Sequence, residues 1–164
     1  MLQKKICMLG SFSVGKTSLV KRFVESIFSD RYLTSVGVKI DKKVIARGGE
    51  ETTLMLWDIY GEDEYQKIRM SYLRGAHGYL LVADGTRGET LDVALAIQQE
   101  AEKHFGPVPF VVAINKTDLM SEWEITSERE AEITARGCTV IRTSAKTGEG
   151  VEQLFESLLK AMIA

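Results

Sequence analysis

The residues with the clearest chemical pattern are 10–17, GSFSVGKT, which match the spacing GxxxxGK followed by Ser or Thr. They come directly after a short apolar run and open a helical stretch, the context that such a loop requires. Glycines allow a loop to turn its backbone N–H groups toward an anion, and the amino end of a helix adds positive potential. Lys16 can neutralise β- and γ-phosphate charge, and the Thr17 hydroxyl can bind Mg²⁺. The structural alternative is a glycine turn entering a helix. The pattern predicts a nucleotide phosphate site at Gly10, Ser13, Val14, Gly15, Lys16, Thr17 and Ser18.

A second element is Asp58-Ile59-Tyr60-Gly61, which follows the apolar run 54–57. A carboxylate at the end of a strand beside the phosphate loop can hold Mg²⁺ through a bound water. Gly61 can bring its N–H to the γ-phosphate. By itself the spacing DxxG would usually be a turn, so its order and position carry the prediction that Asp58 is a metal-site residue.

The third element, residues 115–118 (NKTD), decides which base is bound, and it again follows an apolar run. The Asp118 carboxylate can accept hydrogen bonds from guanine N1–H and the 2-amino group. Adenine has neither donor, so its complex would bury an unpaired carboxylate. The loss of such charge-assisted hydrogen bonds costs several kcal/mol, which can yield a selectivity of ~10³ or more. Asn115 can contact the base edge or tie the loops together, and the stem of Lys116 can cover the ring. The alternative is a polar turn with an Asp cap.

A fourth element, Ser144-Ala145-Lys146, follows the short apolar run 139–141. The N–H of Ala145 can meet the guanine 6-oxo group, although the tripeptide alone says little. All four elements fall where strands end, and open α/β sheets bind ligands at the carboxyl ends of their strands. We therefore expect four separate loops to converge on one guanine nucleotide.

These loops need a sheet to position them, and the apolar runs supply it. Runs without alternation predict parallel strands covered on both faces at 6–9, 54–57, 79–83, 110–114 and 139–141. Residues 36–40 alternate and lead through Gly48-Gly49 into 52–58, which predicts an antiparallel hairpin. Amphipathic stretches predict helices at 19–27, 89–104, 126–136 and 151–162. Strands that alternate with helices indicate a three-layer α/β fold with helices on both faces of the sheet.

Composition indicates one domain, residues 1–164, of ordinary globular character. The net charge of −2 gives no general attraction to nucleic acid or to an anionic membrane. Cys7 and Cys138 cannot form a disulfide framework, which favours a reducing, cytoplasmic setting. No apolar run approaches the length of a membrane span, so we expect no membrane insertion.

The last residues, 160–164, hold no cysteine that could be prenylated. Either the chain acts without a lipid anchor or it is part of a longer protein.

At this point the sequence resembles the Ras superfamily of small GTPases, most closely its Rab-type branch. The segments GSFSVGKTS, WDIYGEDEY, SYLRGAHGYLLVADGT, NKTD and TSAKTGEGV stand in that family's order and spacing. The resemblance implies a P-loop GTPase domain with a six-stranded, mostly parallel sheet, one antiparallel edge strand and about five helices. It also implies GTP, GDP and Mg²⁺ as ligands, and two loops that change shape with the γ-phosphate. Protein effectors or regulators would bind through the loops around 32–40 and 60–74.

The resemblance assigns roles to residues that no local pattern reveals. Phe28 matches the aromatic that packs against the guanine ring, with a core residue at a helix end as the alternative. Ser35 stands where the family has a Thr whose hydroxyl binds Mg²⁺. Serine keeps the hydroxyl but lacks the methyl group that stiffens χ1, so we expect a working but looser switch.

Two departures from the family concern hydrolysis. Glu62 replaces the glutamine that orients the attacking water. A carboxylate about 5 Å from a phosphate charge would be opposed by roughly 3 kcal/mol at an effective dielectric near 20. Phe12 stands where the family has a small residue, and its bulk would crowd an activating partner's arginine. With Lys16, Gly61 and Glu62 as the candidate catalytic residues, we expect slow hydrolysis and a poor response to an activating protein.

The leading interpretation is therefore a nucleotide switch that binds GTP and GDP with Mg²⁺ and hydrolyses GTP. The second is a hydrolysis-deficient GTP-binding module that acts as a persistent on-signal or a structural interaction domain. A third class, a kinase with the same phosphate loop, would need several arginines in a lid over the phosphates, and no such arginine cluster is evident.

Overall fold

The computed structural model describes residues 2–25, 38–59 and 70–163. Four of the candidate site residues lie outside these described ranges, namely Phe28, Ser35, Gly61 and Glu62. Most of the two loops around 32–40 and 60–74 lies outside them as well.

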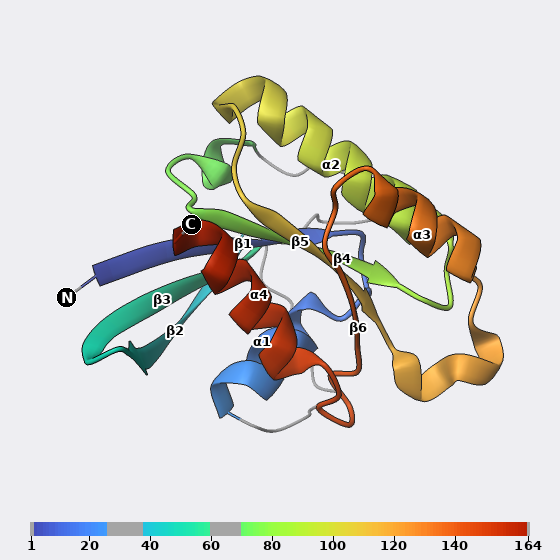
Figure 1. Cartoon of the computed structure of the whole chain (residues 1–164), viewed down its shortest axis with the longest axis horizontal. Coiled ribbons are helices and arrows are strands. Elements are labelled where there is room, and N and C mark those ends of the chain that lie inside the picture. The colour runs from blue at the N-terminus through green and yellow to red at the C-terminus, as the bar shows by residue number, and fades with distance from the viewer. Residues whose placement is uncertain (1, 26–37, 60–69, 164) are drawn as a thin grey trace.

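The centre of the molecule is a six-stranded sheet with the order β2-β3-β1-β4-β5-β6 (Figure 1). All neighbouring strands run parallel except the antiparallel pair β2–β3, which places one antiparallel strand at the sheet edge. The predicted sheet and the predicted hairpin through Gly48-Gly49 are therefore confirmed. The strands are β1 (Leu2–Gly10), β2 (Val38–Arg47), β3 (Glu50–Ile59), β4 (Gly78–Asp84), β5 (Phe110–Asn115) and β6 (Val140–Thr143).

Helices cover both faces of this sheet, which confirms the three-layer α/β class. Over the described residues the α-helices are α1 (Lys16–Glu25), α2 (Glu89–Phe105), α3 (Ser127–Ala135) and α4 (Val151–Ile163). Two short 3₁₀ helices, η1 (Met70–Leu73) and η2 (Thr117–Glu122), complete them. Each α-helix falls within two residues or so of a stretch whose amphipathic pattern predicts it, apart from the amino end of α1.

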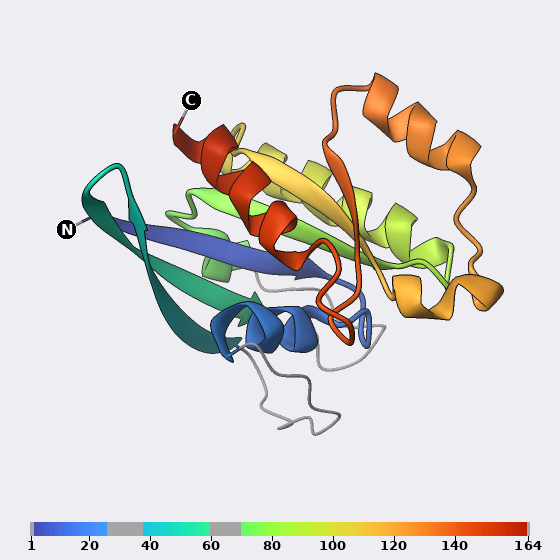
Figure 2. The same ribbon diagram turned by 60° about the horizontal axis from the view of Figure 1, so that its bottom comes forward.

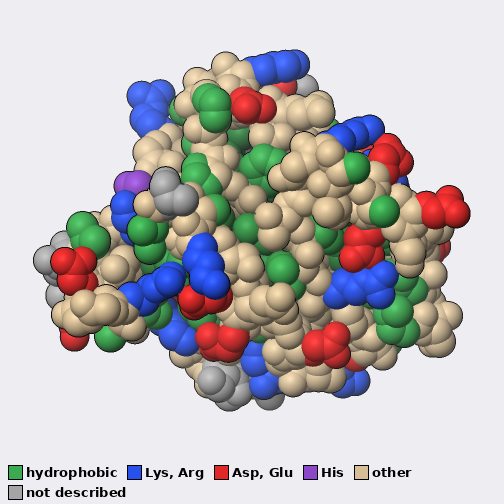
Figure 3. Space-filling view, viewed as in Figure 1, with side chains coloured by type: hydrophobic (Ala, Val, Ile, Leu, Met, Phe, Trp, Pro, Cys, Tyr) green, Lys and Arg blue, Asp and Glu red, His purple; other side chains and the backbone are tan. Residues whose placement is uncertain are grey.

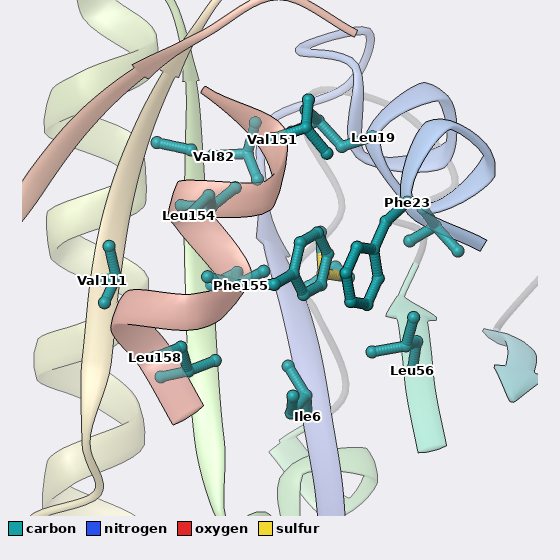
Figure 4. Packing of buried hydrophobic residues seen from close by; sticks show 14 of the residues in the cluster. Ile6, Leu19, Phe23, Leu56, Val82, Val111, Val151, Leu154, Phe155 and Leu158 are labelled. Carbon is teal, nitrogen blue, oxygen red and sulfur yellow. The ribbon is translucent and has the colours of Figure 1, made fainter. Parts of the chain in front are cut away.

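One face of the sheet is covered by α1 and α4, which meet through a pair of aromatic rings. Phe23 of α1 and Phe155 of α4 stack with ring centroids 3.7 Å apart and planes 3° from parallel (Figure 4). Leu154 and Leu158 lie with Phe155 on the apolar stripe of α4, and they point onto the central strands. Burial of this stripe fixes α1, and with α1 the loop that precedes it.

The opposite face carries α2, α3 and η1 over a second apolar cluster. Leu91, Ala94 and Ala101 of α2 are buried there, and Ile133 is the buried residue of α3. Because α2 follows β4 and α3 follows β5 in the chain, these two helices hold the loops that leave those strands.

The apolar strands end in polar residues at one end of the sheet. Asp84, Asn115 and Thr143 are register partners across β4, β5 and β6, and all three are buried. Figure 2 shows the loops after β1, β5 and β6 gathered at this end. The start of β1 and the end of α4 lie at the other end of the molecule in both views. Within the described ranges no helix is long and apolar enough to cross a membrane.

Candidate functional site

The site begins with the loop between β1 and α1, whose two glycines have no room for a side chain. Gly10 has φ +154°, and a Cβ there would lie 2.3 Å from the Val82 carbonyl oxygen. Gly15 has φ +104°, and a Cβ there would lie 2.2 Å from Asn115 Nδ2. Ser13 also adopts a positive φ of 60°. The loop therefore passes close against the ends of β4 and β5, as a loop that wraps an anion requires.

Lys16 folds its side chain back over this loop. Its Nζ donates to the carbonyl oxygens of Gly10 at 3.1 Å and Ser11 at 2.9 Å, and the residue is 7% exposed. Burial lowers the pKa of Lys16 to about 8, against the attraction of Asp58 and with some further lowering from Arg87. The ammonium group is thus a buried cation at the loop, where a phosphate would stabilise its charged form.

Thr17 and Asp58 lie together beside that lysine. The Thr17 hydroxyl donates to Asp58 Oδ2 at 2.5 Å, and Asp58 is 1% exposed. A hydroxyl and a carboxylate are the hard oxygen donors that suit Mg²⁺. The donor set that the sequence predicts for a metal is therefore brought together as far as the structure describes it, since Ser35 lies outside the described ranges.

Asn115 joins the loop after β5 to the phosphate loop. Its Nδ2 donates to the Val14 carbonyl at 3.0 Å, and its Oδ1 accepts from Thr143 Oγ1 at 3.0 Å and Ala145 N at 3.3 Å. The sequence leaves two roles open for Asn115, contact with the base edge or a tie between loops, and the structure shows the tie between loops. The Ala145 N–H is one of the donors to this side chain, so its contact with a base stays a prediction.

The remaining base-loop residues are also held from neighbouring segments. Lys116 has a positive φ of 79°, and its Nζ lies 3.0 Å from the Ser13 carbonyl and 2.9 Å from Asp84 Oδ2. Asp118 is exposed, and its Oδ1 accepts from the buried Ser144 hydroxyl at 2.7 Å. Ser144 thereby fixes the carboxylate that the sequence predicts to select guanine.

Two site residues, Asp84 at the carboxyl end of β4 and Arg87 in the turn that follows, escape the sequence patterns. The Asp84 carboxylate, nearly fully buried, accepts from Lys116 and from Arg87. Burial acts to raise its pKa, but the hydrogen bonds of Thr86 and Lys116 outweigh that effect, so the pKa of Asp84 lies below its ordinary value. The signal was present in the sequence: Asp84 ends an apolar strand in the same way as Asp58 and Asn115.

Arg22 of α1 is a further residue that no motif reveals. Its guanidinium donates to the Ala145 carbonyl at 2.8 Å and to the Lys146 carbonyl at 2.5 Å. It thereby ties the loop after β6 to the helix that carries Lys16. Lys146 itself is exposed, and Ser18 is buried inside α1, so their nucleotide contacts remain predictions.

Sequence comparisons show which known proteins this chain is similar to. The sequence model of the Ras family matches residues 5–164. The chain is 36% identical over 162 residues to Ras-related protein Rab-17 of Mus musculus, covering 97% of this chain and 75% of that protein. It is 31% identical over 159 residues to the GTP-binding protein Rheb homolog of Dictyostelium discoideum, covering 95% and 85%. It is 32% identical over 161 residues to Ras-related protein Rab-21 of Mus musculus, covering 97% of this chain and 72% of that protein.

Proposed function

The chain belongs to the Ras family of small GTPases, and from that membership we propose that it is a guanine-nucleotide switch that binds GTP and GDP with Mg²⁺ and hydrolyses GTP to GDP and phosphate. The observation that carries the proposal is the bridge at Asn115, which joins the loop that suits phosphates to the loop that suits a base. One ligand that has both parts would contact both loops.

Each part of the site has a role in this proposal. Lys16 and the N–H groups of the phosphate loop stabilise negative charge on the phosphates in the ground state and in transfer to water. Thr17 and Asp58 would hold Mg²⁺, which when bound neutralises phosphate charge. Asp118 accepts the two guanine donors, positioned by Ser144. Gly61 and Glu62 lie outside the described residues, and their part in hydrolysis stays a prediction.

Titration with fluorescent GDP, GTP and ATP, with and without Mg²⁺, tests nucleotide choice. We expect GDP and GTP to bind at least about 10³-fold more tightly than ATP, because adenine offers the Asp118 carboxylate neither of the two donors of guanine. Asp118→Ala should lose most of this preference, whereas Glu122→Ala, at an exposed residue four positions on, should keep it. Equal binding of ATP by the natural chain would contradict the proposal.

We further propose that hydrolysis is slow. Phe12 is 60% exposed at the phosphate loop, where its ring is available to obstruct an approaching arginine. Single-turnover GTP hydrolysis should be faster in Glu62→Gln and, with an activating protein present, in Phe12→Gly. Equal rates in the natural chain and both variants would remove this part of the proposal.

The second candidate is a GTP-binding module that barely hydrolyses, and the exposed Phe12 also favours it. The two candidates differ in the nucleotide that the purified protein carries. A switch with slow turnover ends with bound GDP after prolonged incubation, whereas the module retains GTP.

Partners would be proteins that contact the loops around 32–40 and 60–74. Basic and acidic side chains are interspersed over the face shown in Figure 3, in keeping with the net charge of −2. This mixture supports protein partners over nucleic acid, which binds to concentrated positive charge.

A further inference from the structure

The phosphate loop has three consecutive carbonyl groups, each held by a side chain from another segment. Arg87 donates to the Phe12 carbonyl at 2.7 Å, Lys116 to the Ser13 carbonyl at 3.0 Å, and Asn115 to the Val14 carbonyl at 3.0 Å. These donors lie 75 to 103 positions away along the chain. The contacts are therefore made by the fold and not by the loop's own sequence.

A held carbonyl also fixes the N–H group that follows it. A trans peptide is planar, with its C=O and N–H pointing in opposite directions, and no described peptide bond is cis. Holding the Phe12 carbonyl therefore fixes the Ser13 N–H on the other side of the loop. The same argument fixes the N–H groups of Val14 and Gly15, so three successive donors are set for an anion before it binds.

Arg87 and Lys116 are coupled through one carboxylate. Asp84 Oδ2 lies 3.2 Å from Arg87 Nε and 2.9 Å from Lys116 Nζ. Asp84 Oδ1 accepts from the Thr86 N–H at 2.8 Å and the Thr86 hydroxyl at 2.7 Å, so the carboxylate is fully hydrogen-bonded. Because this carboxylate is buried, both cations are oriented by a rigid acceptor.

Resting on the proposed function, we propose that Arg87 is a positioning residue for nucleotide phosphates. From the turn after β4, Arg87 holds the Phe12 carbonyl and so directs the Ser13 N–H toward the β-phosphate of the nucleotide. Its effect then falls on the phosphate part of the ligand and leaves recognition of the base to Asp118.

Affinities for GDP and GMP, measured by competition against fluorescent GDP, separate this role from a general effect on folding. In Arg87→Ala we expect GDP affinity to fall about tenfold, the size of a lost hydrogen bond from a charged donor, and GMP affinity to change less than about twofold. Phosphorus NMR of bound GDP should show a shifted β-phosphate resonance. Arg136→Ala, at an exposed arginine of the α3 end, is the matched control and should change neither quantity.

Arg87→Lys is the second variant, since lysine keeps a cation at Asp84 but loses the fork that reaches two acceptors. It should weaken GDP binding less than Arg87→Ala does, and it serves in place of that variant if alanine prevents folding. An equal loss of GDP and GMP affinity, or an unchanged β-phosphate resonance, would overturn the role of Arg87. If the natural chain binds no GDP, the proposed function itself falls, and this inference falls with it.

Discussion

Lys16 is a cation that the fold keeps out of water with two uncharged carbonyl partners. The attraction of Asp58 offsets burial only in part, and the pKa of Lys16 is about 8. This side chain therefore makes GDP affinity and the free energy of unfolding change with pH in opposite directions.

For binding, phosphates favour the ammonium form, so GDP binding above pH 8 takes up a proton and GDP affinity falls as pH rises. Calorimetric titrations from pH 7 to pH 9.5 in buffers of different ionisation enthalpy measure both quantities. Affinity and proton uptake that are constant across this range would contradict the prediction.

In the ligand-free chain, the contribution of Lys16 to the free energy of unfolding changes with pH in the direction opposite to GDP affinity. Between pH 8 and the ordinary value of 10.5, the unfolded chain holds more protons on Lys16 than the folded chain. The contribution of this residue to the free energy of unfolding therefore rises with pH over that window.

Asp58 gives a second prediction at the level of one residue. Asp58→Asn replaces one carboxylate oxygen with an amide nitrogen beside Thr17, so the Mg²⁺ concentration that slows nucleotide release should rise about 10- to 100-fold. Asp41→Asn is the control, because that carboxylate lies on β2 and pairs with Lys39 at 3.7 Å. The same Mg²⁺ dependence in both variants would show that Asp58 does not contribute to metal binding.

Among the elements, α1 is fixed in place by α4, since Phe23 and Phe155 stack between them (Figure 4). Phe155→Ala should lower the free energy of unfolding by about 3–5 kcal/mol, the usual cost of removing a buried aromatic ring. Chemical denaturation of the natural chain and the variant measures this difference in the free energy of unfolding. Glu156→Ala, next along the helix and half-exposed, should change it by less than about 0.5 kcal/mol. A similar small change for Phe155→Ala would mean that the two helices repack without the ring.

The elements also show where prediction from sequence succeeds. Continuous apolar runs identify the parallel strands because both faces of the sheet are covered. The start of β1 is missed: the strand begins at Leu2, four residues before the apolar run. Lys5 stands directly before the run, yet it belongs to the strand: its Nζ lies 3.6 Å above the Trp57 ring and donates to the Arg74 carbonyl. A charged side chain with such partners is compatible with a strand, and only the fold reveals the partners.

At the scale of the whole molecule, some site residues can be recognised from local sequence motifs, and others only from contacts between distant segments. Lys16 and Asp118 are found from motifs because their chemistry depends on neighbours in sequence. Arg22 and Arg87 are missed because their acceptors lie 123 and 75 positions away. Each donates to backbone carbonyls, which every residue has, so no pattern of side chains marks these contacts.

A ligand that spans loops from four strands should stabilise the entire domain. At a GDP concentration 100 times its dissociation constant, with Mg²⁺, the gain is about 2.7 kcal/mol, or roughly 5–10 °C in Tm. Thermal denaturation with GDP and with ADP measures this gain. ADP should give little of it, and Asp118→Ala should remove most of the difference. Equal shifts with both nucleotides would contradict selection of guanine.

The buried polar row Asp84, Asn115 and Thr143 limits how this chain can change in length. Insertion or deletion of a single residue within β4 or β5 would turn the next side chain to the opposite face and carry a carboxylate or an amide into the apolar layer. The turn at Gly48-Gly49 has no such constraint, since among the described residues, chain neighbours aside, no atom lies within 4 Å of a Cβ added at either glycine. The fold should therefore tolerate insertions and deletions at that turn, and it should be destabilised by them in the strands that end at the polar row.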